Sequence, residues 1–426
     1  MNEEIVVISG GTATNSLVSL FQSLSSNISF VLPISDNGGS TSEILRVLGG
    51  PAIGDIRSRI TRLIPDEGFK TLLSHRLSED PQEAKDEWTL IVEGTHEIWN
   101  GIEPQCKEMV RSFLIHVHME LLKKSRNPAT NFRFELASVG NMLLTGARLF
   151  VGSLDSAIEL ILRMTRIDPG VKVVPCLNTN YTYHISARLN NGDVITGQSQ
   201  ISHPHEHDSE QVLGSTTSVN FHNGLDDLLN QDEDIPYQHP DLLISQLKFS
   251  KEVSEPLKSP IERIFYINQY GEEIHPRANS RTLKVLGESS LIVYSIGSLM
   301  TSIIPVLILQ GIGQTICQSS SKKVLLLNGN LDRETFGMSA YDFIQMVYKA
   351  LKYSNVGSNG SAQKFVVTDI LTHLFYMENS EIKVDVELIS ALGVECVSIT
   401  RDTTLGDDLH FYNLDDLQKE LVHLVN

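Results

Sequence analysis

Cysteine, basic residues and long apolar runs are all scarce in this 426-residue chain, and each shortage argues against a class of protein. The four cysteines, Cys106, Cys176, Cys317 and Cys396, are far apart and form no CxxC pair. This spacing argues against a disulfide framework and against a zinc finger. We expect four reduced and mostly buried thiols.

Basic residues are outnumbered, with 34 lysines and arginines against 52 acidic residues and a formal net charge of -18. Nucleic acid and anionic membranes are therefore not expected as partners, because both need clustered lysine and arginine. A phosphate ligand is not excluded, since local amides, arginines and a divalent cation can hold an anion inside an acidic protein.

No stretch approaches the ~20 uninterrupted apolar residues that a membrane span requires. The hydrophobic content of 41% is nevertheless enough for a sizeable core. The first residues, MNEE, show neither the basic segment of a secretory leader nor the arginine-rich pattern of a transit peptide. We therefore expect a cytoplasmic location.

Short aliphatic runs alternate with helical patterns along most of the chain. The runs are mostly continuous, as in strands that are buried on both faces of a parallel sheet. This alternation predicts an α/β fold with a Rossmann-like, doubly wound and mainly parallel sheet. The predicted strands are 4–9, 28–35, 172–178, 183–189, 263–268, 290–295, 323–328, 364–370 and 393–399.

Other segments depart from this pattern. The stretch NNGD at 190–193 predicts an antiparallel hairpin, which we expect to be attached to the main sheet. Residues 75–130 are charged and are predicted to form a helical insertion. Residues 203–260 are acidic, rich in proline and serine, and predicted to form a long mobile insertion with solvated histidines. Residues 353–363 are predicted to be a flexible connector.

The first candidate site is the stretch VVISGGTATNSLV (6–18), a strand followed by two glycines and a helix start. A helix N-terminus attracts phosphate through its unpaired N–H groups, and glycine lets the backbone approach the ligand. No GK[ST] follows, so this is not a Walker A loop. Gly10, Gly11 and Thr12 are candidates for phosphate binding, but two such glycines could also simply turn the chain.

A second strand-to-helix turn lies in PISDNGGSTSEILRVLGGPAIGDIRSRI, residues 33–60. Asp36 follows a strand, where it can ligate Mg²⁺ or take a proton, and Asp55 and Arg57 follow in GDIR. In the alternative interpretation Asp36 is a turn residue and Asp55 a helix cap. Repetition favours a site, because such turns line up along one edge of an open α/β sheet. The candidate anion-binding residues of this turn are Asn37, Gly38, Gly39 and Ser40.

Two further stretches offer amides and hydroxyls at predicted helix starts. Asn141, in ASVGNMLLTGARL, either caps a helix or projects into the cleft. In SLIVYSIGSLMTSIIPVLI a buried strand is followed by Gly297, Ser298 and Ser302, which suit a phosphate or sugar ligand. An ordinary capped helix start would have a similar sequence.

Seven pieces of the sequence resemble, in the same order, the CofD-like superfamily. This group contains the 2-phospho-L-lactate transferases of coenzyme F420 synthesis and the YvcK-type gluconeogenesis factors, and the resemblance is closer to the YvcK-type branch. It covers most of the chain outside the insertions and implies a single CofD-like α/β domain over residues 1–426. The seven pieces are ISGGTATNSLV, SDNGGSTSEI, GPAIGDIRSRI, SVGNMLL, NNGDVITGQSQI, GSLMTSIIPVLILQGI and NGNLDRET.

The resemblance implies a ligand and roles for residues. The ligand would be a nucleotide diphosphate or nucleotide-sugar, and Asp36 and Asp55 would be catalytic and hold Mg²⁺. The oligomeric state is open, and related proteins point to a homodimer. The sequence departs from the family at Ser9 and Ala13, where glycines are usual. The nucleotide and its phosphates would meet Gly10, Gly11, Thr12, Asn37, Gly38, Gly39, Ser40, Arg57, Asn141, Gly297, Ser298 and Ser302.

Three functions are open at this point. The first is an enzyme that transfers a phosphorylated group from a nucleotide diphosphate donor with Mg²⁺, as a 2-phospho-L-lactate transferase does. The second is a non-catalytic, UDP-sugar-binding regulatory factor of carbon metabolism. The third is a structural α/β protein whose glycine turns bind nothing, and the family pattern favours it least.

Overall fold

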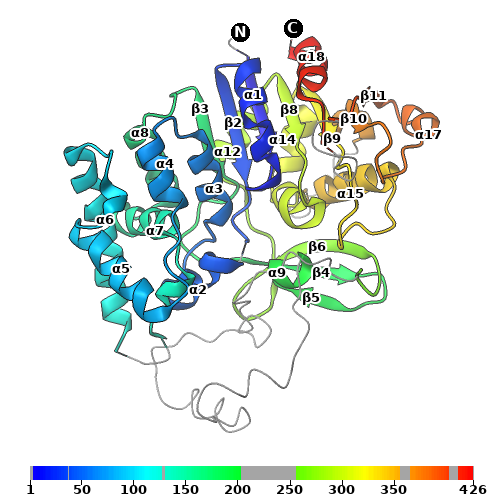
Figure 1. Cartoon of the computed structure of the whole chain (residues 1–426). Helices are drawn as coiled ribbons and strands as arrows, with labels where there is room; N and C mark the ends of the chain where they lie inside the picture. Colours follow the sequence, from blue (N-terminus) through cyan, green and yellow to red (C-terminus); the bar gives the residue numbers. More distant parts are fainter. Residues whose placement is uncertain are drawn as a thin grey trace.

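The computed structural model describes residues 3–36, 38–126, 130–202, 256–355, 365–402 and 411–425. Its centre is a seven-stranded parallel sheet with the order β11-β10-β9-β8-β1-β2-β3 (Figure 1). The predicted α/β class and the mainly parallel sheet are confirmed. The strands are β1 (Glu4–Ile8), β2 (Asn27–Leu32), β3 (Val171–Pro175), β8 (Leu291–Tyr294), β9 (Lys322–Leu326), β10 (His373–Met377) and β11 (Glu395–Ile399).

The central strand β1 is covered on both sides. Its residues Ile5, Val6, Val7 and Ile8 have no exposed surface, although successive side chains of a strand point to opposite faces. The chain adds β2 and β3 on one side of β1 and later adds β8 to β11 on the other side. The winding therefore reverses between β1 and β8, which is where open α/β sheets bind ligands, outside the carboxyl ends of the strands.

Helices connect the strands and cover the sheet. The short 3-10 helix η1 (Ala13–Leu17) leads into α1 (Val18–Leu24), which packs beside the last helix, α18 (Leu414–Val425). Another helix, α12 (Ser280–Glu288), contacts β1 and β3 and packs beside α14 (Ile312–Gln318). Further helices are α2 (Gly39–Leu48), α3 (Gly54–Leu63), α4 (Glu67–Ser74), α7 (Val139–Val151), α8 (Leu154–Met164), α15 (Ala340–Tyr353) and α17 (Val386–Ser390).

A separate antiparallel sheet, with the order β5-β4-β6-β7, corrects one expectation. The NNGD hairpin forms as predicted between β4 (His184–Leu189) and β5 (Val194–Thr196). It is not attached to the main sheet, because the other edge of β4 pairs with β6 (Ile261–Ile267), which in turn pairs with β7 (Glu273–Ile274). The predicted strand at 263–268 therefore belongs to this small sheet.

The small sheet is anchored against the segment that follows β8. Tyr266 of β6 is buried and donates its hydroxyl to the carbonyl of Pro305 in α13 (Ile304–Leu307) at 3.0 Å. After β5, the chain forms the short helix α9 (Gln198–Ser202). The small sheet thus brings α9 to the carboxyl edge of the main sheet (Figure 1).

The strand predicted at 364–370 is wrong. Within its described part, Val367–Ile370 form the short helix α16, and the Asp369 carboxylate accepts the Val366 N–H at the helix start, at 2.8 Å. The sheet position is taken by β10, which pairs with a strand on either side. The apolar run FVV has strand character locally, but pairing partners decide which segment enters a sheet.

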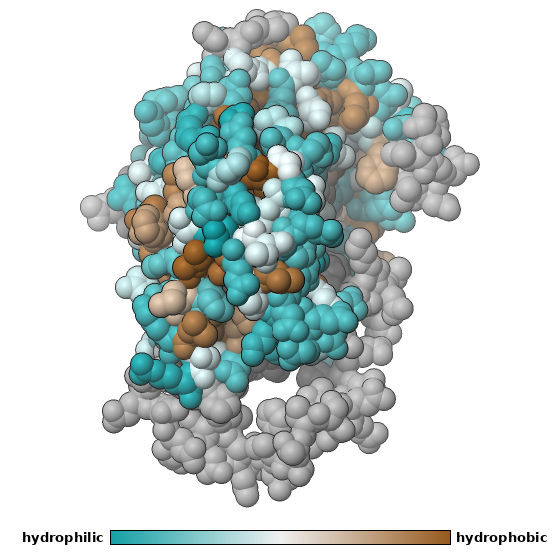
Figure 2. All heavy atoms as spheres, turned by 60° about the vertical axis from the view of Figure 1, so that its left-hand side comes forward, coloured by the Kyte–Doolittle hydropathy of each residue, from teal (hydrophilic) through white to brown (hydrophobic). Residues whose placement is uncertain are grey.

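The range 75–130, predicted as a helical insertion, contains α5 (Pro81–Glu93) and α6 (Pro104–Lys124). Trp88 packs locally, since its indole N–H donates to His118 Nδ1 at 3.1 Å and its ring stacks on Phe134. Figure 2 turns this region forward and shows a largely hydrophilic face with small, separate apolar patches. The exposed apolar side chains of α6 are Met109, Ile115, Met119 and Leu122.

Two predicted segments lie largely outside the described residues. They are the acidic insertion at 203–260, of which 256–260 are described, and the connector at 353–363, of which 353–355 are described. Among the described helices, none combines the length and the apolar character that a membrane span requires.

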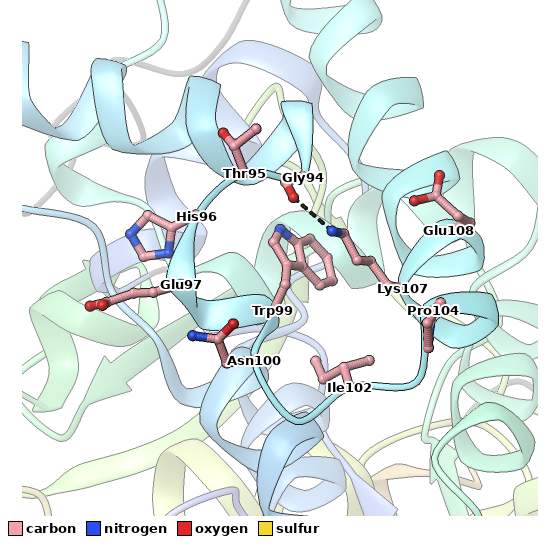
Figure 3. Close-up of a pocket in the computed structure, with 10 residues that line it drawn as sticks. All are labelled: Gly94, Thr95, His96, Glu97, Trp99, Asn100, Ile102, Pro104, Lys107 and Glu108. Atoms are coloured by element: carbon pink, nitrogen blue, oxygen red, sulfur yellow. Dashed lines mark hydrogen bonds between the residues drawn. The ribbon is translucent and has the colours of Figure 1, made fainter.

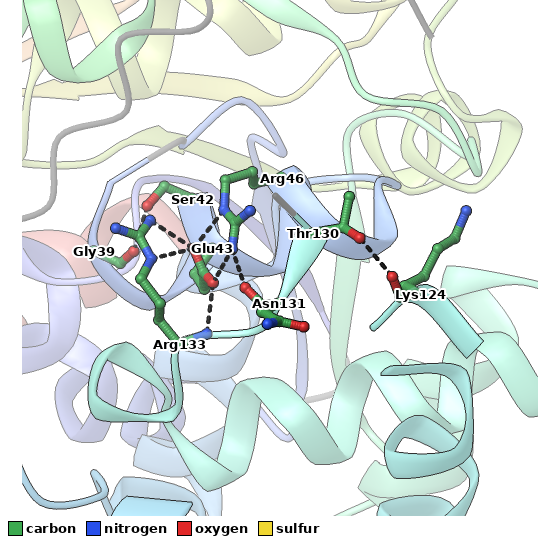
Figure 4. Close-up of polar contacts among 8 residues, drawn as sticks. All are labelled: Gly39, Ser42, Glu43, Arg46, Lys124, Thr130, Asn131 and Arg133. Atoms are coloured by element: carbon green, nitrogen blue, oxygen red, sulfur yellow. Dashed lines mark hydrogen bonds and ion pairs between the residues drawn. The ribbon is translucent and has the colours of Figure 1, made fainter. Parts of the chain in front are cut away.

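The buried carboxylate Glu43 joins α2 to the segment that follows α6 (Figure 4). It has no exposed surface and forms ion pairs with Arg46, at 2.5 Å, and with Arg133, at 2.7 Å. The Arg133 backbone N–H also donates to Glu43, at 2.7 Å. Burial raises the pKa of Glu43, but hydrogen bonds from the two arginines outweigh burial, so that its pKa lies below the ordinary value.

We expect Glu43→Gln to lower the free energy of unfolding by about 2 kcal/mol, because it leaves two arginines without their buried counter-charge. The value is below that of a fully buried pair, since the arginine side chains are 29% and 32% exposed. Urea unfolding at neutral pH measures it. Because the folded-state pKa is lowered, the difference between wild type and variant should shrink as the pH falls through the acidic range.

The matched control is Glu67→Gln, which removes an exposed pair with Lys70. It should change stability by less than about 0.5 kcal/mol. Equal losses in the two variants would show that the Glu43 ion pairs do not hold α2 in place.

Candidate functional site

A cavity of about 1320 Å³ lies at the carboxyl edge of the main sheet, over the reversal between β1 and β8. Its walls are the loops that follow β1, β2, β8 and β9, together with the starts of α2, α3 and α7 and the helix α9. Asn37 lies outside the described residues. Every other predicted site residue lines the cavity: Gly10, Gly11, Thr12, Asp36, Gly38, Gly39, Ser40, Asp55, Arg57, Asn141, Gly297, Ser298 and Ser302.

The first glycine loop is held tightly against the start of α3. The N–H of Gly11 donates to the Asp55 carboxylate at 2.9 Å. A Cβ at Gly11 would lie 2.5 Å from Asp55 Oδ1, and a Cβ at Gly10 would lie 2.5 Å from Ser302 Oγ. The two glycines therefore allow close packing between loops, and the Gly11 amide is already used inside the protein.

Two carboxyl groups, Asp36 after β2 and Asp55 in the first turn of α3, are close enough for the charge of one to act on the other. Burial first, and then the charge of Asp36, raise the pKa of Asp55 to about 7, against the lowering effects of the Gly11 N–H and of nearby arginines. Burial also raises the pKa of Asp36. One Asp36 oxygen accepts the Gly38 N–H at 3.0 Å, whereas the other lies 2.8 Å from the position of a Cβ on Gly54.

The alternative interpretations of these aspartates can now be compared with the structure. Asp36 does shape its own turn through the Gly38 N–H, as the alternative expected. Asp55 is not the cap of α3, because the cap position is Ile53 and Asp55 lies in the first turn. Asn141 is not a cap either, since α7 begins after Ser138 and the Asn141 side chain accepts from Arg57 Nε at 3.3 Å.

Arginines bring positive charge to the same wall. Burial, and then the charge of Arg76, lower the pKa of Arg57, while Asp36 and Asp55 oppose this shift. Neighbouring guanidinium groups of like charge favour an anion between them. Behind the first loop, the fully buried Arg59 donates to the Gly10 carbonyl at 3.1 Å, and its Nε and Nη1 have no acceptor among the described residues.

The loop after β8 ends in a π-helical turn, η5 (Leu299–Ile303), and π-turns are frequent at functional sites. Its cap residue Ser298 accepts the Thr301 N–H at 3.0 Å and donates its hydroxyl to Glu334. Ser202 of α9 also donates to Glu334, as does Thr301 at 3.1 Å. Burial and the charge of Asp332 raise the pKa of Glu334 to about 7, although these hydroxyls lower it.

The sequence interpretation missed several residues of this wall. Glu334 belongs to the quoted motif NGNLDRET, and a carboxylate shortly after a strand was the signal that could have identified it. Arg76 was assigned to an insertion, and it reaches the cavity because its backbone forms a bridge with Ser138 before α7. Ser202 follows the hairpin, and no local signal placed it near the other loops.

The carboxylates of the cavity suit a Mg²⁺ ion that is bound jointly by the protein and a substrate phosphate better than a metal ion that is bound by the protein alone. Across the described residues, no group of three or more His, Cys, Asp or Glu side chains could hold a metal ion. Mg²⁺ usually binds through one or two carboxylates plus substrate phosphates. Asp36 and Asp55 provide such a pair. Burial raises the pKa of both, and the charge of Asp36 raises the pKa of Asp55 further, which a bound cation would oppose.

A second hollow, of about 470 Å³, lies in the helical region between the end of α5 and the start of α6 (Figure 3). Lys107 on its wall already donates to the Gly94 carbonyl at 2.7 Å, and the Trp99 indole donates to the Ile91 carbonyl at 3.0 Å. Its described lining residues all come from 94–108, which contains no strand, and Lys107 and Trp99 use their polar groups to hold the turn together. It is therefore not the candidate site.

Comparison with known proteins identifies the family of this chain. Residues 5–401 match the family described as 2-phospho-L-lactate transferase CofD. The chain belongs to the CofD family. The resemblance found in the sequence is thereby confirmed over nearly the whole chain.

Known relatives and a solved structure agree with the assignment of this chain to the CofD family. An uncharacterised protein of Saccharomyces cerevisiae is 46% identical over 421 residues, which is 93% of this chain and 95% of the yeast protein. A gluconeogenesis factor of Halalkalibacterium halodurans is 21% identical over 93% of this chain and 88% of its own length. The crystal structure of protein BH3568 from Bacillus halodurans shares the fold, with a TM-score of 0.62 and 18% identity over 99% of this chain and 100% of that one.

We expect Gly11→Ala to lower the free energy of unfolding by about 2 kcal/mol, because the added methyl overlaps Asp55 and separates the two loops. The matched control is Gly287→Ala in α12, where a Cβ meets only Thr315 Cγ2 at 3.7 Å. That variant should be unchanged or up to about 1 kcal/mol more stable. Urea unfolding of both variants measures the difference, and equal stabilities would contradict the close contact.

Glu334 should make stability depend on pH. Its folded pKa of about 7 lies above the ordinary value of 4.5, so its favourable contribution is complete below pH 4.5 and is lost as the pH rises towards 7. We expect Glu334→Gln to flatten the decline of unfolding free energy over this interval, leaving the share of Asp55. An exposed glutamate of α5 provides the control variant, Glu93→Gln. Parallel profiles for wild type and Glu334→Gln would contradict the assignment.

Proposed function

We propose that this chain binds a nucleoside diphosphate derivative in the main cavity and, with Mg²⁺, transfers a phosphorylated group from it. The observation that carries the proposal is the meeting of two carboxyl groups, Asp36 and Asp55, with Arg57 and Arg76 on one wall of the cavity. A site that bound only an anion would not need two neighbouring carboxylates. A diphosphate together with a divalent cation uses both kinds of charge.

The basic and the acidic residues of the cavity would bind different parts of the ligand. Arg57 and Arg76 would hold phosphate oxygens, together with the first N–H groups of α2, whose residues Gly39 and Ser40 line the cavity. Asp36 and Asp55 would hold Mg²⁺, which when bound neutralises charge that develops on the phosphates. The Gly11 N–H fixes the orientation of Asp55, so this carboxylate needs no rearrangement when the ligand arrives.

In the proposed transfer, an acceptor hydroxyl loses its proton to solvent and forms a P–O bond to the phosphorus of the transferred group, while the P–O bond of the diphosphate breaks and a nucleoside monophosphate leaves. Placing the donor among fixed amides and arginines would supply most of the rate enhancement, as is general for phosphoryl chemistry. When water takes the place of the acceptor, hydrolysis of the donor would release the same monophosphate, which can be measured without knowledge of the acceptor.

A second function has support from the relatives. The proteins of Halalkalibacterium halodurans and Clostridium acetobutylicum that align along this chain are named gluconeogenesis factor and putative gluconeogenesis factor. In that case the same cavity would bind a UDP-sugar and the chain would act as a regulator without turnover. The two functions differ in catalysis and not in the place of the ligand.

Thermal unfolding with GDP, UDP and UDP-sugars, each with and without Mg²⁺, tests the binding site. A ligand at about 100 times its dissociation constant stabilises the folded state by about 2.7 kcal/mol. We expect Asp36→Asn to lose the part of this stabilisation that depends on Mg²⁺ and to keep the metal-independent part. Asparagine retains an oxygen for the Gly38 N–H, so the turn itself should persist.

The control is Asp86→Asn on the exposed face of α5, which should respond to nucleotide and metal as wild type does. Release of nucleoside monophosphate in the presence of Mg²⁺ would support the enzyme. Saturable binding with no release for any donor would favour the regulator. No stabilisation by any nucleotide would overturn both.

A further inference from the structure

The long helix α6 is apolar on two opposite sides. One side packs into the protein through the buried residues Val110, Phe113, Leu114, Val117 and Leu121. The other side carries apolar residues that are between 41% and 53% exposed, namely Met109, Ile115, Met119 and Leu122. A surface helix normally has a polar outer side. Within the described part of the chain nothing covers the outer side of α6, which lies at the left of the molecule in Figure 1.

The exposed side of α6 has the spacing of a helix that pairs with another helix. The residues along its middle follow one another at alternating intervals of four and three positions, and all of them are exposed. This is the heptad pattern with which two helices pack along each other. We call these residues the α6 seam: Glu108, Ser112, Ile115, Met119, Leu122 and, just beyond the helix, Arg126.

The charges of the α6 seam differ between its two ends. Glu108 lies near the start of the helix and is 63% exposed, although it pairs with Arg111 at 2.6 Å. The other end is basic and contains Lys123, Lys124 and Arg126. A parallel pair of such helices would bring the two basic ends together. An antiparallel pair instead places Glu108 of each helix beside the basic end of the other, and opposed helix dipoles favour the same orientation.

We propose that two copies of this chain form a homodimer through the α6 seam, with their α6 helices antiparallel across a two-fold axis. An axis that passes beside Val117 places Met119 against Ile115 of the second copy. It also places Leu122 against Ser112 of the second copy, where the small serine leaves room for the leucine. Two-fold symmetry repeats each contact, so the exposed apolar residues of both seams are covered together.

The charged ends identify a second copy as the partner. In the antiparallel pair Glu108 lies next to Arg126 of the second copy, with Lys123 of that copy close by. Exposed ion pairs add little affinity, but contacts between like charges disfavour the wrong orientation. The α6 seam is thus complementary to its own reverse, because apolar residues meet apolar or small ones and the acidic residue meets basic ones.

Sedimentation velocity of the full chain from about 1 to 200 µM tests the proposal, since a single helix pair is smaller than a standard interface and should dissociate in the micromolar range. A salt concentration of about 0.15 M screens the repulsion between two chains of net charge -18. Met119→Glu should weaken the dimer at least about ten-fold, because it places two carboxylates at the centre of the interface. The matched control is Leu388→Glu, which changes a 45% exposed leucine of α17 and should leave association unchanged.

Reversal of charge tests the antiparallel orientation. Glu108→Lys should weaken self-association about ten-fold, and the double variant Lys123→Glu with Arg126→Glu should do the same, because each brings like charges together. When the two variants are mixed, the lysine at 108 of one faces the acidic end of the other. The mixture should therefore associate about as strongly as wild type. Circular dichroism of each variant checks that the helices are kept.

A wild-type chain that stays monomeric over the whole concentration range would overturn the inference. A dimer that survives Met119→Glu would also overturn it, because another surface would then hold the two copies together. A mixture of the charge variants that fails to associate would exclude the antiparallel pairing. None of the residues of the α6 seam lines the main cavity, so these outcomes are independent of the proposed function.

Discussion

The hydrogen bond from the Gly11 N–H to the Asp55 carboxylate is the contact on which the arrangement of the cavity depends. It joins the loop after β1 to the start of α3, and only a residue without a side chain at position 11 allows the approach. Ser58 reinforces the junction by donating to the Gly11 carbonyl at 3.2 Å. On the other side, Thr14 donates to the Ile296 carbonyl at 2.9 Å and so ties η1 to the loop after β8.

Buried carboxyl groups lie around this junction, and keeping them charged has an energetic cost. The carboxyl groups of Asp36, Asp55 and Glu334 all have raised pKa values because burial disfavours their charged forms. A folded protein keeps such groups when another part of the fold offsets the cost or when a ligand does. Hydroxyls surround Glu334 and leave its carboxylate satisfied within the protein. Within the described part of the chain, each aspartate of the pair accepts one backbone N–H, which leaves oxygens for a cation.

Membership of the CofD family and the position of the cavity at the reversal of the sheet agree, yet neither decides between catalysis and regulation. A fold supports many functions, and the chemistry depends on a few side chains at one edge. The main cavity presents arginines and carboxylates together on one wall. That arrangement suits a substrate and a regulatory ligand alike, so turnover is the property that separates the two functions.

The sequence alone determined the α/β class, the glycine turns after β1 and β2, and the grouping of Gly10, Asp36, Asp55 and Ser298, because strand and turn signals are local and parallel strands end at one edge. It did not determine which edge β4 would pair with, or that 367–370 would form a helix, since pairing partners decide sheet membership. Nor could it bring Arg76 and Ser202 to the cavity. They come from segments far apart in the chain, and only tertiary packing sets the distances between them.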